Sequence, residues 1–243
     1  MNTKSTLDQL KQLKLHGMAA TYQAILDQPV HQQPEPHLLM GMLTEAEIQA
    51  RQSSRTEMYL KLSRLRYHAL PEQINCSEQR GITSTQLIQL TDGAFIERGD
   101  NILITGATGC GKSYLACALG RKACILGHRT LYYSMNRFIE TLGTARLDGT
   151  YVKWLNVIAK TPLLILDDFG LKPLDSDIRL TLLQIMEDRY QRGSTIVTSQ
   201  LPVNKWYDYI GEPTLADAIL DRLTAHAHRI DLKGESLRKN KLA

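Results

Sequence analysis

Eight consecutive residues near the middle of the chain place glycines, a lysine and a hydroxyl side chain at fixed spacing. They run Gly106-Ala107-Thr108-Gly109-Cys110-Gly111-Lys112-Ser113 and match the pattern G-x-x-x-x-G-K-[ST] at every required position. Glycine adopts the backbone angles of a loop whose N–H groups turn inward, and it lets the main chain approach a ligand closely. A helix that follows the loop adds free N–H groups and its positive dipole end. Together these features favour binding of a polyphosphate.

We therefore predict that the segment from Gly106 to Tyr114 binds the phosphates of ATP. Lys112 would reach the β- and γ-phosphates and stabilise charge as they react. Ser113 would ligate Mg²⁺, which prefers hard oxygen ligands and keeps several waters. The alternative is a glycine-rich turn that matches by chance. A short apolar run before the motif and a helical pattern after it supply the context that the motif requires.

Two neighbouring carboxylates follow a run of four apolar residues, Leu163 to Leu166. In P-loop enzymes such a strand lies beside the strand that carries the phosphate loop, and its first carboxylate holds Mg²⁺. We assign that role to Asp167 and expect Asp168 to polarise the attacking water. The alternative is an acidic turn after a core strand, which the nearby phosphate loop makes less favourable.

Three later polar residues could act on the same phosphates. Gln200 follows an apolar strand and could orient water or sense the γ-phosphate, or could be a polar strand exit. Arg222 lies on an amphipathic helix and could reach a neighbouring subunit's γ-phosphate as an arginine finger, or could pair with Asp221 or Asp217. Arg238 could return to the phosphates of its own subunit, or could belong to a frayed tail.

The elements that must position these residues alternate between strands and helices from residue 101 onward. We predict strands over 101–105, 129–134, 163–167, 194–199 and 229–232, and helices over 114–126, 178–190 and 214–225. This alternation is typical of an α/β fold in which a five-stranded parallel sheet has helices on both faces.

The first 70 residues have a different pattern. Apolar residues recur at helical spacing from Leu7 to Leu26 and again from Leu38 to Tyr67, with a proline-rich break between the two runs and Pro71 after the second. We predict a small helical N-terminal domain over residues 1–70, for assembly or partner contact, and an ATPase domain over residues 71–243.

Composition limits the class of protein. A chain of 243 residues with 43% hydrophobic residues can bury a core, and a net charge of +4 permits a polyanion partner without requiring one. The four cysteines lack C-x-x-C or zinc spacing, which indicates reduced, buried thiols. Since the N-terminus lacks an apolar signal core and no long apolar run occurs, we expect a cytoplasmic protein without membrane contact.

Several segments together resemble the IstB family, the ATPase helper proteins of an insertion-sequence transposition system. These segments are residues 10–18, 106–113, 115–120, 164–170, 196–202, 221–223 and 234–238. The phosphate loop is common to many families. The sequences Asp-Asp-Phe-Gly at 167–170, Thr-Ser-Gln-Leu-Pro at 198–202 and Gly-Glu-Ser-x-Arg at 234–238 are much narrower. The resemblance covers nearly the full chain and extends to the related DnaC-type helicase loaders.

This resemblance implies an AAA+ ATPase with a reduced or absent C-terminal lid, because the chain ends shortly after Arg238. It implies a homo-oligomer that assembles with ATP on duplex DNA with little sequence preference and remodels that DNA. The oligomer would select a target and stimulate the transposase of the same element, and ATP hydrolysis would drive disassembly. This chain departs from the family pattern at two positions, since many AAA+ proteins carry Glu in place of Asp168 and related ATPases carry Asn in place of Gln200.

Basic residues in the insert between the second and third predicted strands are the first candidates for contacts with DNA phosphates. They are Arg137, Arg146 and Lys153; a second candidate set is Arg55, Lys61, Arg64 and Arg66. The alternative for each set is a solvated charged face.

Two competing functions use the same phosphate loop. A helicase loader would have a hexameric helicase as its partner, whereas a small-molecule kinase would need an acceptor pocket and usually a mobile lid. The carboxylate pair and Arg222 favour hydrolysis in an oligomer over phosphate transfer to a small molecule.

Overall fold

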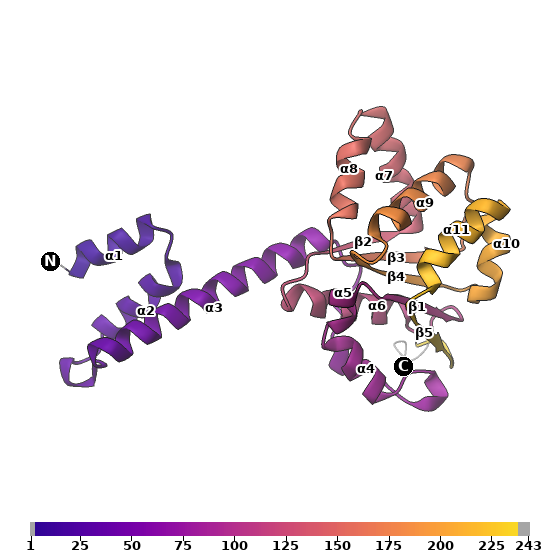
Figure 1. Ribbon diagram of the computed structural model, residues 1–243. Coiled ribbons are helices and arrows are strands. Elements are labelled where there is room, and N and C mark those ends of the chain that lie inside the picture. The colour runs from indigo at the N-terminus through magenta and orange to yellow at the C-terminus, as the bar shows by residue number, and fades with distance from the viewer. Residues whose placement is uncertain (1–2, 238–243) are drawn as a thin grey trace. The chain divides into compact units, whose positions relative to one another are not determined.

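The computed structural model describes residues 3–237 and divides the chain into two compact units, residues 1–58 and 59–243 (Figure 1). Helix α3 (Pro36–Ser63) is part of both units. Within the described residues, none of the helices has the length and apolar character needed to cross a membrane.

The N-terminal unit is a pair of short helices followed by the first part of α3. Helices α1 (Thr3–Gln12) and α2 (His16–Leu26) precede a single 3₁₀ turn, η1 (Val30–Gln32). A carboxylate from α3 stabilises the start of α2: Oε2 of Glu47 accepts hydrogen bonds from the backbone N–H groups of Gly17 (2.8 Å) and Met18 (3.2 Å). These N–H groups have no partner within their own helix, so the contact acts as a cap supplied from another helix.

The second unit is built on a five-stranded parallel sheet with the strand order β2-β3-β4-β1-β5. The strands are β1 (Asn101–Gly106), β2 (Thr130–Ser134), β3 (Leu163–Phe169), β4 (Ser194–Ser199) and β5 (Ala227–Leu232). The predicted parallel sheet is thereby confirmed. One prediction about it is wrong: the acidic strand β3 does not lie beside the phosphate-loop strand β1, because β4 pairs with both and lies between them.

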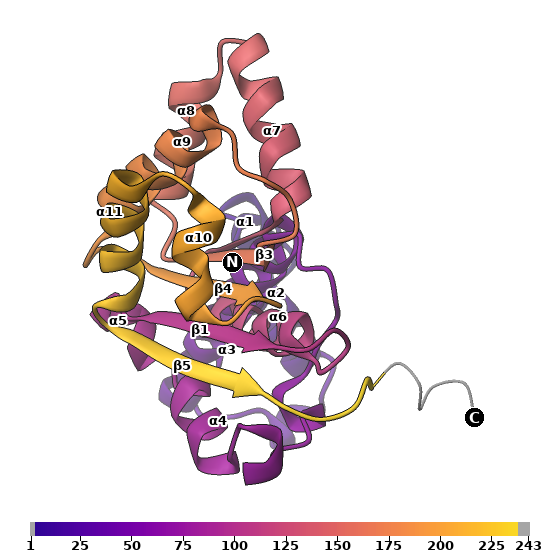
Figure 2. The same cartoon turned by 90° about the vertical axis from the view of Figure 1, so that its right-hand side faces the viewer.

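Helices cover both faces of this sheet (Figures 1 and 2). On one face lie α4 (Ser84–Thr91), α5 (Ala94–Arg98) and α6 (Lys112–Ile125); on the other lie α7 (Met135–Leu147), α8 (Tyr151–Ala159), α9 (Ser176–Arg189), α10 (Trp206–Ile210) and α11 (Pro213–Thr224). Short 3₁₀ turns occur at Pro71–Gln73 (η2), Glu78–Arg80 (η3) and Val203–Lys205 (η4).

The two faces of the sheet belong to separate hydrophobic clusters. Leu103 and Leu166 are buried with α7 to α11, whereas Ile102, Ile104 and Ile165 are buried with α4 to α6. Side chains alternate between the faces of a strand, so a stretch that packs against apolar clusters on both faces is apolar at successive positions. This explains the continuous apolar runs at residues 102–104 of β1 and 163–166 of β3.

The structure changes the bounds of the predicted helices by one to four residues, and two of the changes have a clear local cause. Helix α9 starts at Ser176, two residues earlier than predicted, because the side chain of Asp175 accepts a hydrogen bond from the N–H of Ile178 (2.8 Å) and caps the helix. Helix α3 ends at Ser63 instead of continuing to Tyr67, since Arg64 has a left-handed backbone conformation (φ 55°). Leu65 and Tyr67 then pack against the cluster that contains α6.

We predict that Gly17→Ala destabilises the N-terminal unit by about 1–3 kcal/mol, the usual cost of overpacking. A Cβ atom at Gly17 would lie 2.3 Å from the backbone oxygen of Ala46, and a main-chain atom cannot rotate away. Hydrogen exchange of the α2 and α3 amides in the full chain measures the effect.

The matched control is Gly41→Ala, also in a helix of this unit, where a Cβ atom would meet no other atom within 4 Å. We expect this variant to be neutral or stabilised by up to about 1 kcal/mol. Equal exchange rates in the two variants would contradict the close approach of α2 to α3.

Candidate functional site

The phosphate-loop sequence forms a tight connection between β1 and α6. Gly106, the last residue of β1, has φ 141°, and a Cβ atom there would lie 2.1 Å from the carbonyl oxygen of Leu232 in β5. Gly109 also has a positive φ, of 85°. These angles and the close approach of β5 explain why the loop needs glycine. The strand–loop–helix context predicted for the motif is present.

Lys112 lies inside this loop and is almost fully buried, with 6% of its surface exposed. Its ammonium group donates hydrogen bonds to the carbonyl oxygens of Gly106 and Ala107, both at 2.9 Å. The cation is therefore held at the first turn of α6, next to the helix N-terminus, where an anion is favoured.

Asp167 is a fully buried carboxylate, at 0% exposure, and three hydroxyl groups donate hydrogen bonds to it. Ser113 (2.8 Å) and Thr198 donate to Oδ1, and Tyr132 donates to Oδ2 (2.5 Å). Burial, and then the hydrogen bond to Asp167, raise the pKa of Tyr132 above its usual value, so its hydroxyl keeps the proton that it donates.

The pair formed by Ser113 and Asp167 fits a magnesium ion. The two side chains present oxygen atoms 2.8 Å apart at the N-terminus of α6, and oxygen ligands are those that Mg²⁺ prefers. The described residues contain no cluster of three or more His, Cys, Asp or Glu side chains.

Asp168 lies at an irregularity in β3. The pairing of β3 with β4 shifts between Leu166 and Phe169, and Asp168 has φ 64°, a left-handed conformation that Asp tolerates better than most residues. The backbone N–H of Asp168 donates to the hydroxyl of Thr198 (3.1 Å). In a regular strand, residues 167 and 168 would point to opposite faces. The bulge instead lets both carboxylates approach one cation.

That cation is Arg66, a member of the second set of residues predicted to contact DNA phosphates. Its Nη1 atom lies 3.4 Å from Oδ2 of Asp168 and 3.8 Å from Oδ2 of Asp167. Because α3 ends at Ser63, the chain turns and brings Arg66 to the carboxylates. Arg66 is thus a member of this site that motif spacing did not indicate, 102 residues before Asp168.

Gln200 contacts the phosphate loop directly. The hydroxyl of Thr108 donates a hydrogen bond to Oε1 of Gln200 at 2.8 Å. Strand β4 therefore supplies Thr198 to the buried carboxylate and leads into Gln200 at the loop. Tyr114, the last residue of the predicted phosphate segment, instead donates to the side chain of Gln73.

A further residue, which no sequence motif indicates, contacts the main chain of the loop. Nη2 of Arg80 donates to the carbonyl oxygen of Cys110 (3.0 Å). The segment after β5 joins the same region, since the N–H of Lys233 donates to the carbonyl of Arg80 and that of Leu237 to the carbonyl of Gly109, each at 3.0 Å. Arg238 lies outside the described residues.

Arg222 lies at the opposite edge of the sheet from the phosphate loop. The side chain of Asn101, at the start of β1, donates to the carbonyl oxygen of Arg222 (3.0 Å), whereas the loop follows the end of β1 at Gly106. Five residue steps of about 3.3 Å separate these ends by roughly 16 Å. The guanidinium pairs with Glu187 (3.0 Å) and with neither of the local carboxylates considered as alternatives.

The three candidates for DNA contacts lie on the helical insert formed by α7 and α8. Arg137 pairs with Glu140 (3.3 Å), and Arg146 pairs with Asp177 on α9. Lys153 has no ion pair in the described part of the chain. It lines an open groove together with Arg129 and Lys160.

Comparisons with known proteins cover almost the whole chain. The profile of the family described as "IstB-like ATP binding protein" matches residues 8–243. An insertion sequence ATP-binding protein of Sinorhizobium fredii, y4pL, is 44% identical over 235 residues, which cover 97% of this chain and 96% of that protein. The insertion sequence IS21 ATP-binding protein of Pseudomonas aeruginosa is 32% identical over 94% of this chain and 86% of that protein.

Solved structures share the fold at lower sequence identity. The DnaC helicase loader superposes with a TM-score of 0.58 at 21% identity and covers 69% of this chain and 98% of its own. AMPPCP-bound DnaA from Aquifex aeolicus gives a TM-score of 0.60 at 21% identity, over 74% of this chain and 55% of its own. These likenesses agree with the AAA+ P-loop fold.

We predict that Tyr132→Phe lowers the free energy of unfolding by about 1–3 kcal/mol, because Asp167 loses a hydroxyl donor inside the protein. Urea denaturation without nucleotide measures this effect. The control is Tyr207→Phe, since Tyr207 is an exposed residue and its hydroxyl has no hydrogen bond within the described residues. If both variants unfolded at the same urea concentration, the hydrogen bond from Tyr132 to Asp167 would not contribute to the free energy of unfolding.

Proposed function

The chain belongs to the family of IstB-like ATP-binding proteins, and from this membership we propose that it is a DNA-binding ATPase that helps a transposase. The observation that carries the proposal is the convergence of Lys112, Ser113 and Asp167 at the N-terminus of α6. The proteins that match this chain along nearly their full length are named as insertion sequence ATP-binding proteins, which supports a role in transposition.

In the proposed nucleotide site, the loop from Gly106 to Ser113 wraps the phosphates of ATP with its backbone N–H groups. Lys112 exchanges its two loop carbonyls for the β- and γ-phosphate oxygens, which carry full negative charge. Ser113 and Asp167 would hold Mg²⁺, which when bound supplies positive charge to the β- and γ-phosphates.

Hydrolysis in this site requires a water molecule aligned with the γ-phosphate. We assign to Asp168 the role of accepting a hydrogen bond from that water and the proton that it loses, and to Gln200 the role of orienting it. The water oxygen bonds to the γ-phosphorus, the bond from that phosphorus to the β–γ bridging oxygen breaks, and ADP and inorganic phosphate leave. The proton then passes from Asp168 to phosphate or solvent. Arg238 is proposed as a second cation for the phosphates of the same subunit.

Arg222 can complete this site only in a second copy of the chain. It lies at the edge of the sheet where the strands start, while its own phosphate loop lies at the other edge. We infer that Arg222 contacts the γ-phosphate bound by a neighbouring subunit and stabilises the charge of the transition state. Turnover would then depend on a homo-oligomer.

Duplex DNA is the proposed platform for this oligomer. Lys153 is the strongest of the three candidate contacts, because Arg137 and Arg146 already pair with carboxylates. The groove that it shares with Arg129 and Lys160 contains three cationic residues and no acidic residue in its lining. Such a surface fits the phosphate backbone and carries no sequence preference by itself. Hydrolysis would release the assembly, and the helical N-terminal unit would serve assembly or contact with the transposase.

We predict that Asp168→Asn binds ATP with nearly unchanged affinity but hydrolyses it at least about 100-fold more slowly, because an amide accepts no proton from water. Equilibrium binding of labelled ATP and single-turnover hydrolysis separate the two effects. Asp175→Asn removes the same charge at the N-cap of α9, where Asn can also accept the capping hydrogen bond, and is the control for loss of charge. Normal hydrolysis by Asp168→Asn would remove Asp168 from the catalytic role.

We predict that ATP and random-sequence duplex DNA together drive assembly and raise ATPase activity, as measured by sedimentation and steady-state turnover at two salt concentrations. Replacing Lys153 and Lys160 by Gln should weaken DNA binding and reduce the slope of log affinity against log salt by about 2. The control replaces Lys172 and Lys205 by Gln, which removes the same charge outside the groove. If duplex DNA changes neither assembly nor turnover, a loader directed at a protein partner becomes the better assignment.

A further inference from the structure

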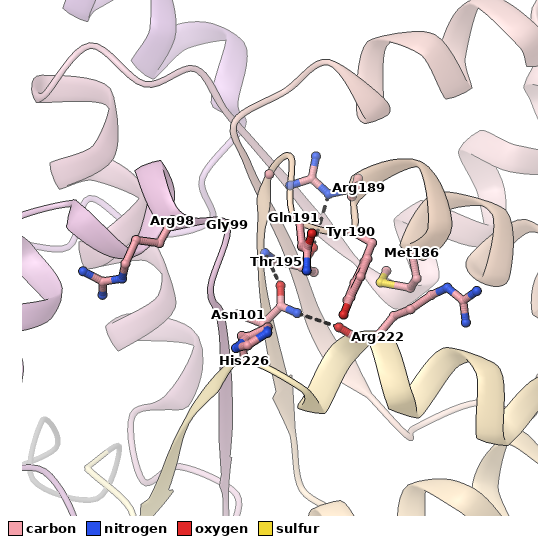
Figure 3. Close-up of a pocket in the computed structure, with 11 residues that line it drawn as sticks. Arg98, Gly99, Asn101, Met186, Arg189, Tyr190, Gln191, Thr195, Arg222 and His226 are labelled. Carbon is pink, nitrogen blue, oxygen red and sulfur yellow. Dashed lines mark hydrogen bonds between the residues drawn. The ribbon is translucent and has the colours of Figure 1, made fainter.

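A pocket at the edge where the strands start contains several basic side chains (Figure 3). Arg189 is buried, and its guanidinium donates to the carbonyl oxygens of Ile158 (2.7 Å) and Thr161 (2.6 Å), so it stabilises the end of α8. Arg98 pairs with Asp100 at 2.7 Å. Arg222 differs from both, because its partner Glu187 belongs to another helix, α9, and lies at the surface.

The main chain of Arg222 is held by a side chain from the sheet. The amide of Asn101 donates to the carbonyl oxygens of Arg222 (3.0 Å) and Leu223 (3.2 Å), and its Oδ1 accepts from the N–H of Thr195 (2.9 Å). Asn101 thus ties the end of α11 to the starts of β1 and β4. Figure 3 shows the guanidinium of Arg222 extending away from Asn101.

The side chain of Arg222 has two contacts of its own. Its Nη1 donates to the carbonyl of Ala218 (2.8 Å), and its Nη2 lies 3.0 Å from Oε1 of Glu187. The side chains of this pair are 28% and 49% exposed, so water screens the attraction and the pair contributes little to stability. A triphosphate presents several negative charges and can bind a guanidinium through two hydrogen bonds.

We propose that Glu187 is a regulatory competitor for Arg222: it binds the guanidinium in the separate subunit and gives it up to the nucleotide of a second copy. The proposal rests on the proposed role of Arg222 in a neighbouring site. Asn101 holds the main chain at the helix end, so the exchange requires rotation of the two side chains and loss of the hydrogen bond from Nη1 of Arg222 to Ala218. The Glu187 pair thereby sets the protein concentration at which copies assemble around ATP.

Glu187→Gln tests this exchange, because it keeps the size of the side chain and removes the charge that competes with phosphate. With saturating ATP, we expect the protein concentration that gives half-maximal ATPase activity to fall about two- to fivefold, with the same plateau. Sedimentation with a non-hydrolysable ATP analogue should give the same shift in assembly. The matched control is Asp188→Asn, the next residue on α9, which is exposed and changes the net charge equally; it should behave as the wild type.

The double variant Glu187→Gln/Arg222→Ala should assemble as Arg222→Ala alone does. The proposal is overturned if Glu187→Gln matches Asp188→Asn, if it raises the half-maximal concentration, or if its shift persists without Arg222. Failure of the proposed function is a different observation: Arg222→Ala would then hydrolyse ATP at the wild-type rate, whatever Glu187→Gln does.

Discussion

The carboxylate of Asp167 is a negative charge with no exposure to water, and most of the site is arranged around it. Such a group costs several kcal/mol unless it is hydrogen-bonded or paired. Here the hydroxyls of Ser113, Tyr132 and Thr198 donate to it from three different elements, α6, β2 and β4. The same interaction fixes the start of α6, and with it Lys112, against the end of β3.

The strand order makes this arrangement possible. Because β4 lies between β1 and β3, its last residues lie between the phosphate loop and the acidic strand. Thr198 then reaches Asp167, and Gln200 reaches Thr108 in the loop. The bulge in β3 also brings the carboxylate of Asp168 towards the side on which Asp167 lies. Arg66 lies close to both carboxylates there. If β3 and β1 were neighbours, the polar end of β4 could not lie between the phosphate loop and Asp167.

The opposite edge of the sheet presents a separate set of contacts. At this edge, where the strands begin, the side chain of Asn101 donates a hydrogen bond to the end of α11. The guanidinium of Arg222 forms an ion pair with Glu187. Since one chain carries the loop at one edge and the arginine at the other, the proposed chemistry belongs to a pair of copies. An ion pair exposed to water is suited to such an exchange, because little stability is lost when its arginine changes partner.

Short sequence patterns were enough to predict part of the fold and part of the site. The glycines, Lys112 and Ser113 of the loop, the apolar strands and the carboxylates of Asp167 and Asp168 each follow from a short pattern, since backbone angles and strand burial depend on neighbouring residues. The position of β4 between β3 and β1 does not follow from such a pattern, because parallel strands far apart in the chain can pair in several orders. Tyr132 is separated from Asp167 by 35 residues, Arg66 from Asp168 by 102 and Glu187 from Arg222 by 35. These contacts exist only where packing brings distant segments together, so the tertiary structure alone decided them.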